Sequence, residues 1–136
     1  MVLKVLVIED MDISYKVMLR GLEKLLLMQN FEFINIKTIP LALDALEQDW
    51  DTILIDYYLG VPFGERQGSS FENGADLITY RRTLEKDDPE KTKAYIIGIS
   101  GSDLRNEEMV GVGATCSFLK QDDTGLAEAL AALEKC

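Results

Sequence analysis

The chain has 136 residues, with 14 Lys and Arg against 24 Asp and Glu, a formal net charge of −10 and no histidine. This length favours one domain with a self-sufficient core. The negative charge argues against nucleic acid as a partner, because phosphates need a basic face. The lack of histidine excludes Ser-His and Cys-His catalysis and most zinc sites. Cys116 and Cys136 are too few for a secreted disulfide framework and favour a reducing cytoplasm.

The first apolar run, Leu3 to Ile8, has the length of a buried strand and meets Glu9 at once, so it is too short for a membrane span or a cleaved signal segment. Further strand-length apolar runs alternate with segments of helical spacing. In chain order we expect strand 3–8, helix 13–26, strand 33–37, helix 41–46, strand 52–55, helix 77–81, strand 95–99, a short helix near Met109, strand 115–119 and helix 126–133. The N-cap candidates are Asp12, Thr38, Asp103 and Thr124.

Strict alternation of strands and helices predicts right-handed crossovers and a parallel sheet buried on both faces. We therefore expect an α/β fold with a doubly wound five-stranded parallel sheet, flavodoxin-like order 2-1-3-4-5 and helices on both faces. No repeat or linker divides the chain, so residues 1–136 should form a single domain. The Gly- and Ser-containing loop 57–73 exceeds the roughly two to six residues usual for such a connection, which indicates a functional or disordered insertion.

Polar residues follow four of the expected strands: Glu9 and Asp10 follow the first, Asp56 the third, Ser100 the fourth and Lys120 the fifth. In open α/β sheets, ligands bind at the carboxyl ends of the strands, where the strand order reverses. With order 2-1-3-4-5 the first and third strands are neighbours. The three carboxylates are therefore expected to share one crevice.

Three carboxylates in one crevice repel one another unless a cation neutralises them. Magnesium suits this set because it prefers oxygen ligands and takes one or two carboxylates together with a phosphate. Lys120 and Ser100 would then supply a positive charge and a hydroxyl donor to the phosphoryl oxygens. With no histidine available, the Asp56 carboxylate is the expected nucleophile, and the expected reaction is phosphoryl transfer that forms an acyl phosphate.

At these positions the chain resembles bacterial response-regulator receiver domains, the CheY-like family. The resemblance covers nearly the whole chain and is carried by Lys4–Asp10, Ile53–Asp56, Ile97–Gly101, Gly113–Ala114 and Phe118–Lys120. It implies that Asp56 accepts the phosphoryl group, that Ser100 contacts it and that Lys120 pairs with it. Each of these motifs alone is weak evidence for the family, but their occurrence together and in this order along the chain is specific.

The resemblance also implies a magnesium ion bound by Asp10, Asp56 and the carbonyl of Tyr58, with Glu9 acting mainly through water. A sensor histidine kinase or a histidine phosphotransfer protein would donate the phosphoryl group. A surface near the last two strands would then change its affinity for a downstream protein target. We expect a stand-alone cytoplasmic regulator that promotes its own phosphorylation and dephosphorylation and is not otherwise an enzyme, with no nucleic-acid or membrane partner.

The chain departs from the family pattern at three places. Gln121 follows the lysine where the family usually has proline, and Ser117 occupies the position of the family's aromatic switch residue. Asn73 and Gly74 resemble the turn that opens the third helix, which makes the long loop an insertion after Asp56. These departures predict a switching mechanism that differs from the usual inward rotation of a ring.

Three other functions compete with this one. A pseudo-receiver, which binds partners without being phosphorylated, fits the departures but not the intact acid, serine and lysine set. A phosphatase of the haloacid dehalogenase type would need an aspartate two positions after Asp56, where this chain has Tyr58. A flavodoxin would need a phosphate-binding loop after the first strand, where Glu9 and Asp10 would repel the flavin phosphate.

Overall fold

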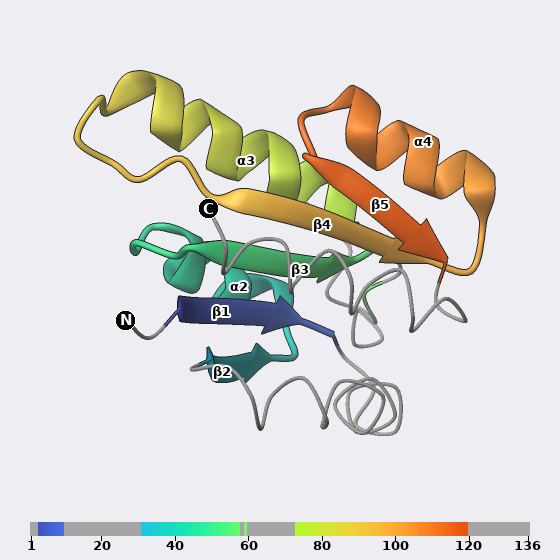
Figure 1. Ribbon diagram of the computed structural model, residues 1–136, viewed down its shortest axis with the longest axis horizontal. Helices are drawn as coiled ribbons and strands as arrows, with labels where there is room; N and C mark the ends of the chain where they lie inside the picture. The colour runs from blue at the N-terminus through green and yellow to red at the C-terminus, as the bar shows by residue number, and fades with distance from the viewer. Residues whose placement is uncertain (1–2, 10–30, 58, 60–72, 120–136) are drawn as a thin grey trace.

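The computed structural model describes residues 3–9, 31–57, 59 and 73–119, which form one five-stranded sheet and three helices (Figure 1). In chain order these are β1 (Leu3–Ile8), β2 (Phe31–Ile36), α2 (Ile39–Leu46), β3 (Thr52–Asp56), α3 (Gly74–Asp87), β4 (Tyr95–Ser100), α4 (Asp103–Gly111) and β5 (Cys116–Leu119). The helices expected at 13–26 and 126–133, with their caps Asp12 and Thr124, lie outside the described residues. Within the described part, no helix is long and apolar enough to cross a bilayer.

The sheet is parallel throughout and has the strand order β2-β1-β3-β4-β5, as the sequence predicts. The strand boundaries lie within two residues of the expected ones. β3 and β4 each extend one residue further than predicted and end on the polar residues Asp56 and Ser100. The ladder between β3 and β4 pairs Asp56 with Ile99, so backbone pairing continues to the last residue of β3.

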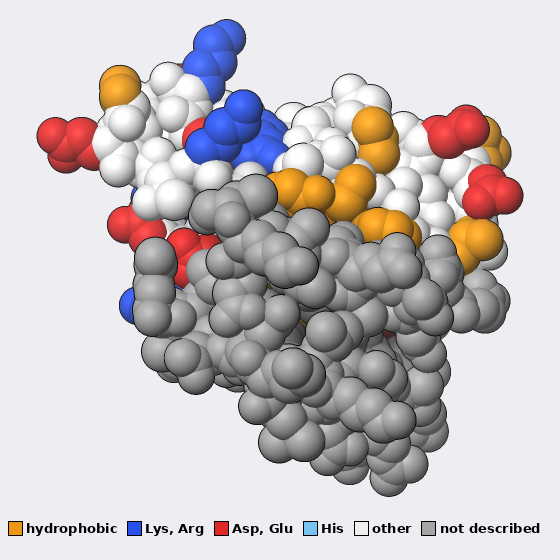
Figure 2. Space-filling model, viewed as in Figure 1, with side chains coloured by type: hydrophobic (Ala, Val, Ile, Leu, Met, Phe, Trp, Pro, Cys, Tyr) orange, Lys and Arg blue, Asp and Glu red, His pale blue; other side chains and the backbone are white. Residues whose placement is uncertain are grey.

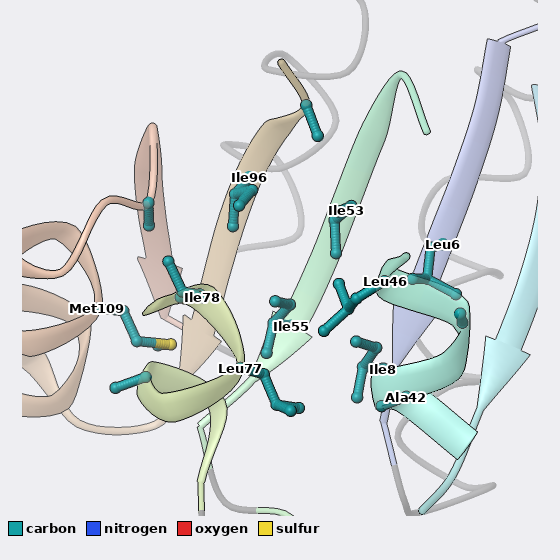
Figure 3. Packing of buried hydrophobic residues seen from close by; sticks show 14 of the residues in the cluster. Leu6, Ile8, Ala42, Leu46, Ile53, Ile55, Leu77, Ile78, Ile96 and Met109 are labelled. Carbon is teal, nitrogen blue, oxygen red and sulfur yellow. The ribbon is translucent and has the colours of Figure 1, made fainter. Parts of the chain in front are cut away.

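One face of the sheet carries the core that α2, α3 and α4 cover (Figure 3). Side chains alternate between the faces of a strand, so every second residue of β1, β3 and β4 contributes to this core. The labelled members are Leu6, Ile8, Ala42, Leu46, Ile53, Ile55, Leu77, Ile78, Ile96 and Met109. The intervening residues Val5, Val7, Leu54 and Ile97 are buried as well, which explains why the strands appear as continuous apolar runs.

The helix starts follow the local capping chemistry. Thr38 caps α2, where its hydroxyl accepts a hydrogen bond from the Leu41 amide. Asn73 caps α3 through a reciprocal capping box with Asp76. The cap predicted for α4 was wrong: Ser102 is the N-cap and Asp103 is the first helical residue, where its carboxylate faces the positive end of the helix dipole.

The amino end of the sheet is held by two arginines of α3. Arg81 is fully buried, and its guanidinium donates to the carbonyls of Leu46 at 2.6 Å, of Thr92 at 2.7 Å and of Gln48. It also forms an ion pair with Glu85 at 2.9 Å. These bonds join α3 to the turn after α2 and to the loop before β4, so one side chain fixes two connections.

Arg82 completes this network on the side of β5. Its guanidinium donates to the carbonyls of Ala94 at 2.8 Å and Gly113 at 2.9 Å, and it pairs with Glu85 at 2.7 Å. Burial alone would raise the pKa of Glu85, but the Ala94 amide and the two guanidinium groups outweigh burial and hold this pKa below its ordinary value of 4.5. Glu85 is therefore a stabilising anion at neutral pH.

Candidate functional site

The carboxyl edge of the sheet brings together three of the predicted polar residues from adjacent strands. Asp56 ends β3 and is 3% exposed, Glu9 follows β1 and is 7% exposed, and Ser100 ends β4 and is fully buried. The register pairs Ile8 with Ile55, so Glu9 and Asp56 are the next residues along neighbouring strands. Two acidic residues and a serine therefore occupy one edge, at the point where the strand order reverses.

Backbone and side-chain hydrogen bonds position the flanking residues. The Glu9 amide donates to the Ile36 carbonyl at 3.1 Å, and the Asn35 side chain donates to the Glu9 carbonyl at 3.3 Å. On the other side, the Ser100 hydroxyl accepts from the Ser102 amide at 3.1 Å. This contact places the hydroxyl of Ser100 directly before the N-terminus of α4.

Gly74 is the residue of α3 that allows the helix to begin against the backbone of Asp56. A Cβ atom at Gly74 would lie 2.4 Å from the Asp56 carbonyl oxygen, a distance that real Cβ atoms do not reach. The Gly74 amide also donates to the Tyr57 carbonyl at 2.9 Å. The sequence predicted the turn at Asn73 and Gly74, but not this close approach, because a glycine in a turn signal does not show what it packs against.

Tyr57 connects the end of β3 to α4. Its amide donates to the Ile99 carbonyl at 3.1 Å, and its ring lies below the Arg105 guanidinium, 5.1 Å from the ring centroid. A cation over an aromatic face at this distance is attracted by the ring quadrupole. Tyr57, the residue after Asp56, is therefore buried, and Arg105 of α4 contacts its ring.

The remaining predicted residues of this site fall outside the described part of the chain. These are Asp10, Tyr58 and Lys120, together with Gln121 and residues 60–72 of the long loop. Ser117 is described: it lies in β5 opposite Gly98 and is partly buried. The position of the family's aromatic switch residue therefore holds a small polar side chain without a ring.

The described donors fit a hard divalent cation. Glu9 and Asp56 supply carboxylate oxygens on neighbouring strands, and two buried like charges are unfavourable without a compensating positive charge. Within the described ranges there is no group of three or more His, Cys, Asp or Glu that would form a complete metal cage. Magnesium does not require one, because it takes one or two carboxylates and completes its shell with water and phosphate oxygens.

The fold is that of response-regulator receiver domains. The receiver domain of the Francisella response regulator 1452 superposes with a TM-score of 0.70 at 18% identity, covering 98% of this chain and 97% of that one. A CheY-like receiver domain from Methylobacillus flagellatus gives the same TM-score and identity, with 98% and 99% covered. A Burkholderia pseudomallei response regulator with a phosphorylated aspartic acid and a calcium ion gives 0.59 at 22% identity, with 98% and 75% covered.

Comparison by sequence finds no such likeness, since no family model matches the chain and no curated protein matches it. At these identities the structural likeness establishes the CheY-like fold. What the site does is therefore argued from its residues.

Proposed function

We propose that the protein is a phosphoacceptor of a two-component or phosphorelay system, in which Asp56 is phosphorylated in a magnesium-dependent reaction. The observation that carries this proposal is the placement of Asp56, Glu9 and Ser100 together at the carboxyl edge of β1, β3 and β4. Two carboxylates and a hydroxyl at neighbouring strand ends suit a site that receives a cation and a phosphoryl group.

In the proposed step a carboxylate oxygen of Asp56 attacks the phosphorus atom of the donor. The new bond joins this oxygen to phosphorus, and the bond from phosphorus to the donor's histidine nitrogen breaks, leaving the electron pair on that nitrogen. The Ser100 hydroxyl donates to an oxygen of the transferred group, and the Lys120 ammonium pairs with another. Both contacts become stronger as charge shifts onto these oxygens.

The metal site of this proposal consists of Asp10, Asp56, the carbonyl of Tyr58 and, through water, Glu9. These residues would hold a magnesium ion, whose positive charge would offset the charges of the phosphoryl oxygens and the carboxylates. The chain's own contribution is to hold Glu9 and Asp56 at adjacent strand ends before the ion binds. Preorganisation of this kind avoids moving charged groups during the reaction.

The wider role follows from this chemistry. A sensor histidine kinase or a histidine phosphotransfer protein would donate the phosphoryl group, and residues 1–136 would act as a single cytoplasmic receiver domain. The same site would promote removal of the group by water. Phosphorylation would change the affinity for a downstream protein at the surface formed near β4 and β5.

The experiment incubates the purified chain with acetyl phosphate, with and without magnesium, and compares Asp56→Asn with Asp44→Asn. Asp44 is an exposed residue of α2 and serves as the matched control. We expect a hydroxylamine-labile mass increase of one phosphoryl group in the wild type and in Asp44→Asn, only with magnesium, and none in Asp56→Asn. No modification of the wild type would instead support a pseudo-receiver, and turnover of unrelated phosphomonoesters would support a phosphatase.

A further inference from the structure

The first turn of α4 contacts Ser100, the serine at the carboxyl edge of the sheet, at two of its polar groups. The Ser102 amide donates to the Ser100 hydroxyl at 3.1 Å, and the Asn106 Nδ2 atom donates to the Ser100 carbonyl at 3.4 Å. The backbone amide of Asn106 donates in turn to the Ser102 carbonyl at 3.1 Å. Ser100 therefore cannot move without changing its contacts with α4.

Asn106 is a polar residue on the inner face of α4. The buried residues of this helix are Asn106 and Met109, whereas its outer face carries exposed acidic and apolar side chains, which Figure 2 shows over the α4 end of the molecule. Met109 packs against Gly98 of β4, where an added Cβ atom would lie 2.9 Å from the methionine sulfur. This close approach of α4 to β4 also brings the Asn106 side chain within reach of Ser100.

The side-chain amide of Asn106 contributes poorly to the stability of the fold. Its Nδ2 contact with Ser100 is long for a hydrogen bond, and its Oδ1 atom is buried with no partner among the described residues. A buried acceptor without a donor is unfavourable, and an apolar side chain of the same size would avoid this loss. The amide is therefore better explained by a function at Ser100 than by packing.

The contact with Ser102 directs the hydroxyl group of Ser100. A hydroxyl has one donor and two acceptor positions, and the Ser102 amide occupies one of the acceptor positions. The hydroxyl proton is thus left for another acceptor, such as a phosphoryl oxygen. Its direction depends on the position of the Ser100 backbone, and the carbonyl of that backbone is the group that Asn106 contacts.

We propose that Asn106 is a positioning residue that acts through Ser100, a role that rests on the function proposed above. Its amide fixes the Ser100 backbone so that the hydroxyl meets the phosphoryl group on Asp56. Hydrogen bonds that support a reaction are often long in the free protein and shorten only in the reacting complex, which fits the 3.4 Å contact. Loss of the amide should therefore slow phosphorylation without weakening the fold.

The first test compares Asn106→Leu with the wild type in the rate of phosphorylation by acetyl phosphate and magnesium. Leucine keeps the size of the side chain and removes the amide. We expect the rate to fall about three- to tenfold, which corresponds to one neutral hydrogen bond, while the melting temperature stays the same or rises. Met109→Leu is the control, because it changes the other buried side chain of α4 without removing a hydrogen bond, and it should leave the rate unchanged.

A double-mutant cycle separates an effect through Ser100 from a general effect on α4. Ser100→Ala removes the hydroxyl, so the addition of Asn106→Leu to this variant should cause no further loss of rate. An unchanged rate in Asn106→Leu would overturn the role of Asn106. An equal loss of rate with and without the Ser100 hydroxyl would overturn it as well.

NMR of the ¹⁵N-labelled chain decides the question without a substitution at Asn106. Beryllofluoride and magnesium imitate the phosphorylated state, and they should shift the side-chain amide signal of Asn106 in the wild type but not in Ser100→Ala. A shift at the Asp56 backbone amide without one at the Asn106 side chain would overturn the positioning role and leave the proposed function intact. Absence of both shifts would refute the proposed function and the positioning role together.

Discussion

The amino end of the sheet pairs its buried charges with opposite charges and carbonyls, whereas the carboxyl end places two buried carboxylates on neighbouring strands. Arg81, Arg82 and Glu85 are joined by two ion pairs. Glu9 and Asp56, which are 7% and 3% exposed, carry the same sign of charge. The first arrangement stabilises the fold, and the second is the one that we propose to receive a cation and a phosphoryl group.

This contrast teaches which substitutions should affect stability and which should affect chemistry. A buried ion pair that loses one partner leaves an uncompensated charge, so changes at the amino end should destabilise strongly. A functional site carries groups that are unfavourable for folding, so changes at the carboxyl end should abolish phosphorylation with little loss of stability. The helix α3 contacts both ends of the sheet, so variants of this one helix can test both expectations.

The largest effect is expected for Arg81→Met. The change leaves Glu85 with one cationic partner and removes the donors to three carbonyls, so we expect a loss of about 3–5 kcal/mol in the free energy of unfolding. Urea denaturation measures it. Lys86→Met, an exposed change on the same helix, should stay within about 0.5 kcal/mol. A loss below about 1 kcal/mol for Arg81→Met would show that the network is not the main support of this end.

Glu85→Gln should lower the free energy of unfolding by about 1.5–3 kcal/mol at pH 7, because hydrogen bonds to a charged acceptor are lost. The folded-state pKa of Glu85 lies below 4.5, so its contribution is fully present above that pH and is lost as the pH falls through the folded value. Denaturation from pH 7 to 3 should therefore show wild type and variant converging below pH 4.5. A constant difference across this range would contradict the assignment, and Glu90→Gln is the control.

Gly74→Ala tests the contact between α3 and the carboxyl end of the sheet. The added methyl group would meet the Asp56 carbonyl, and displacement of α3 should lower the free energy of unfolding by about 1–3 kcal/mol despite the better helix propensity of alanine. The rate of phosphorylation by acetyl phosphate should fall as well. Gly101→Ala is the matched control, since no atom lies within 4 Å of its added Cβ, and it should change neither measurement. Equal behaviour of the two variants would contradict the close approach.

The smallest effect on stability is expected for Asp56→Asn. Removing a carboxylate from the proposed metal site should weaken the stabilisation that magnesium provides. Magnesium should therefore stabilise the wild type more than the variant, which thermal denaturation with and without the ion measures. Equal stabilisation of the two proteins by magnesium would contradict a metal site at Asp56.

The strands could be predicted from the sequence because burial on both faces makes each one a continuous apolar run. The alternation of these runs with helices predicted a parallel, doubly wound sheet, and the order 2-1-3-4-5 was taken from the flavodoxin-like arrangement of such sheets. The cap of α4 was missed, because Ser102 and Asp103 are both good N-cap residues and only the backbone geometry separates them. The helices expected at 13–26 and 126–133 stay predictions.

The sequence could not show which groups the buried polar residues contact. The sequence predicts a helix over 77–81 that includes Arg81, but the carbonyls that Arg81 binds belong to residues 46, 48 and 92, which only the tertiary fold brings together. Asn106 gave one signal, a polar residue at helical spacing from the buried Met109. Its contact with the Ser100 carbonyl required the structure, and the roles of Asp10, Tyr58 and Lys120 stay predictions.

The anchoring of α3 at both of its ends has a mechanical consequence. Gly74 abuts the backbone of Asp56 at one end, and Arg81 and Arg82 clamp the loops before β3, β4 and β5 at the other. A helix that is fixed at both ends resists tilting. A displacement that starts at the end of β3 should therefore be deflected toward α4, which is joined to that region through the Tyr57 ring and the Asn106 amide.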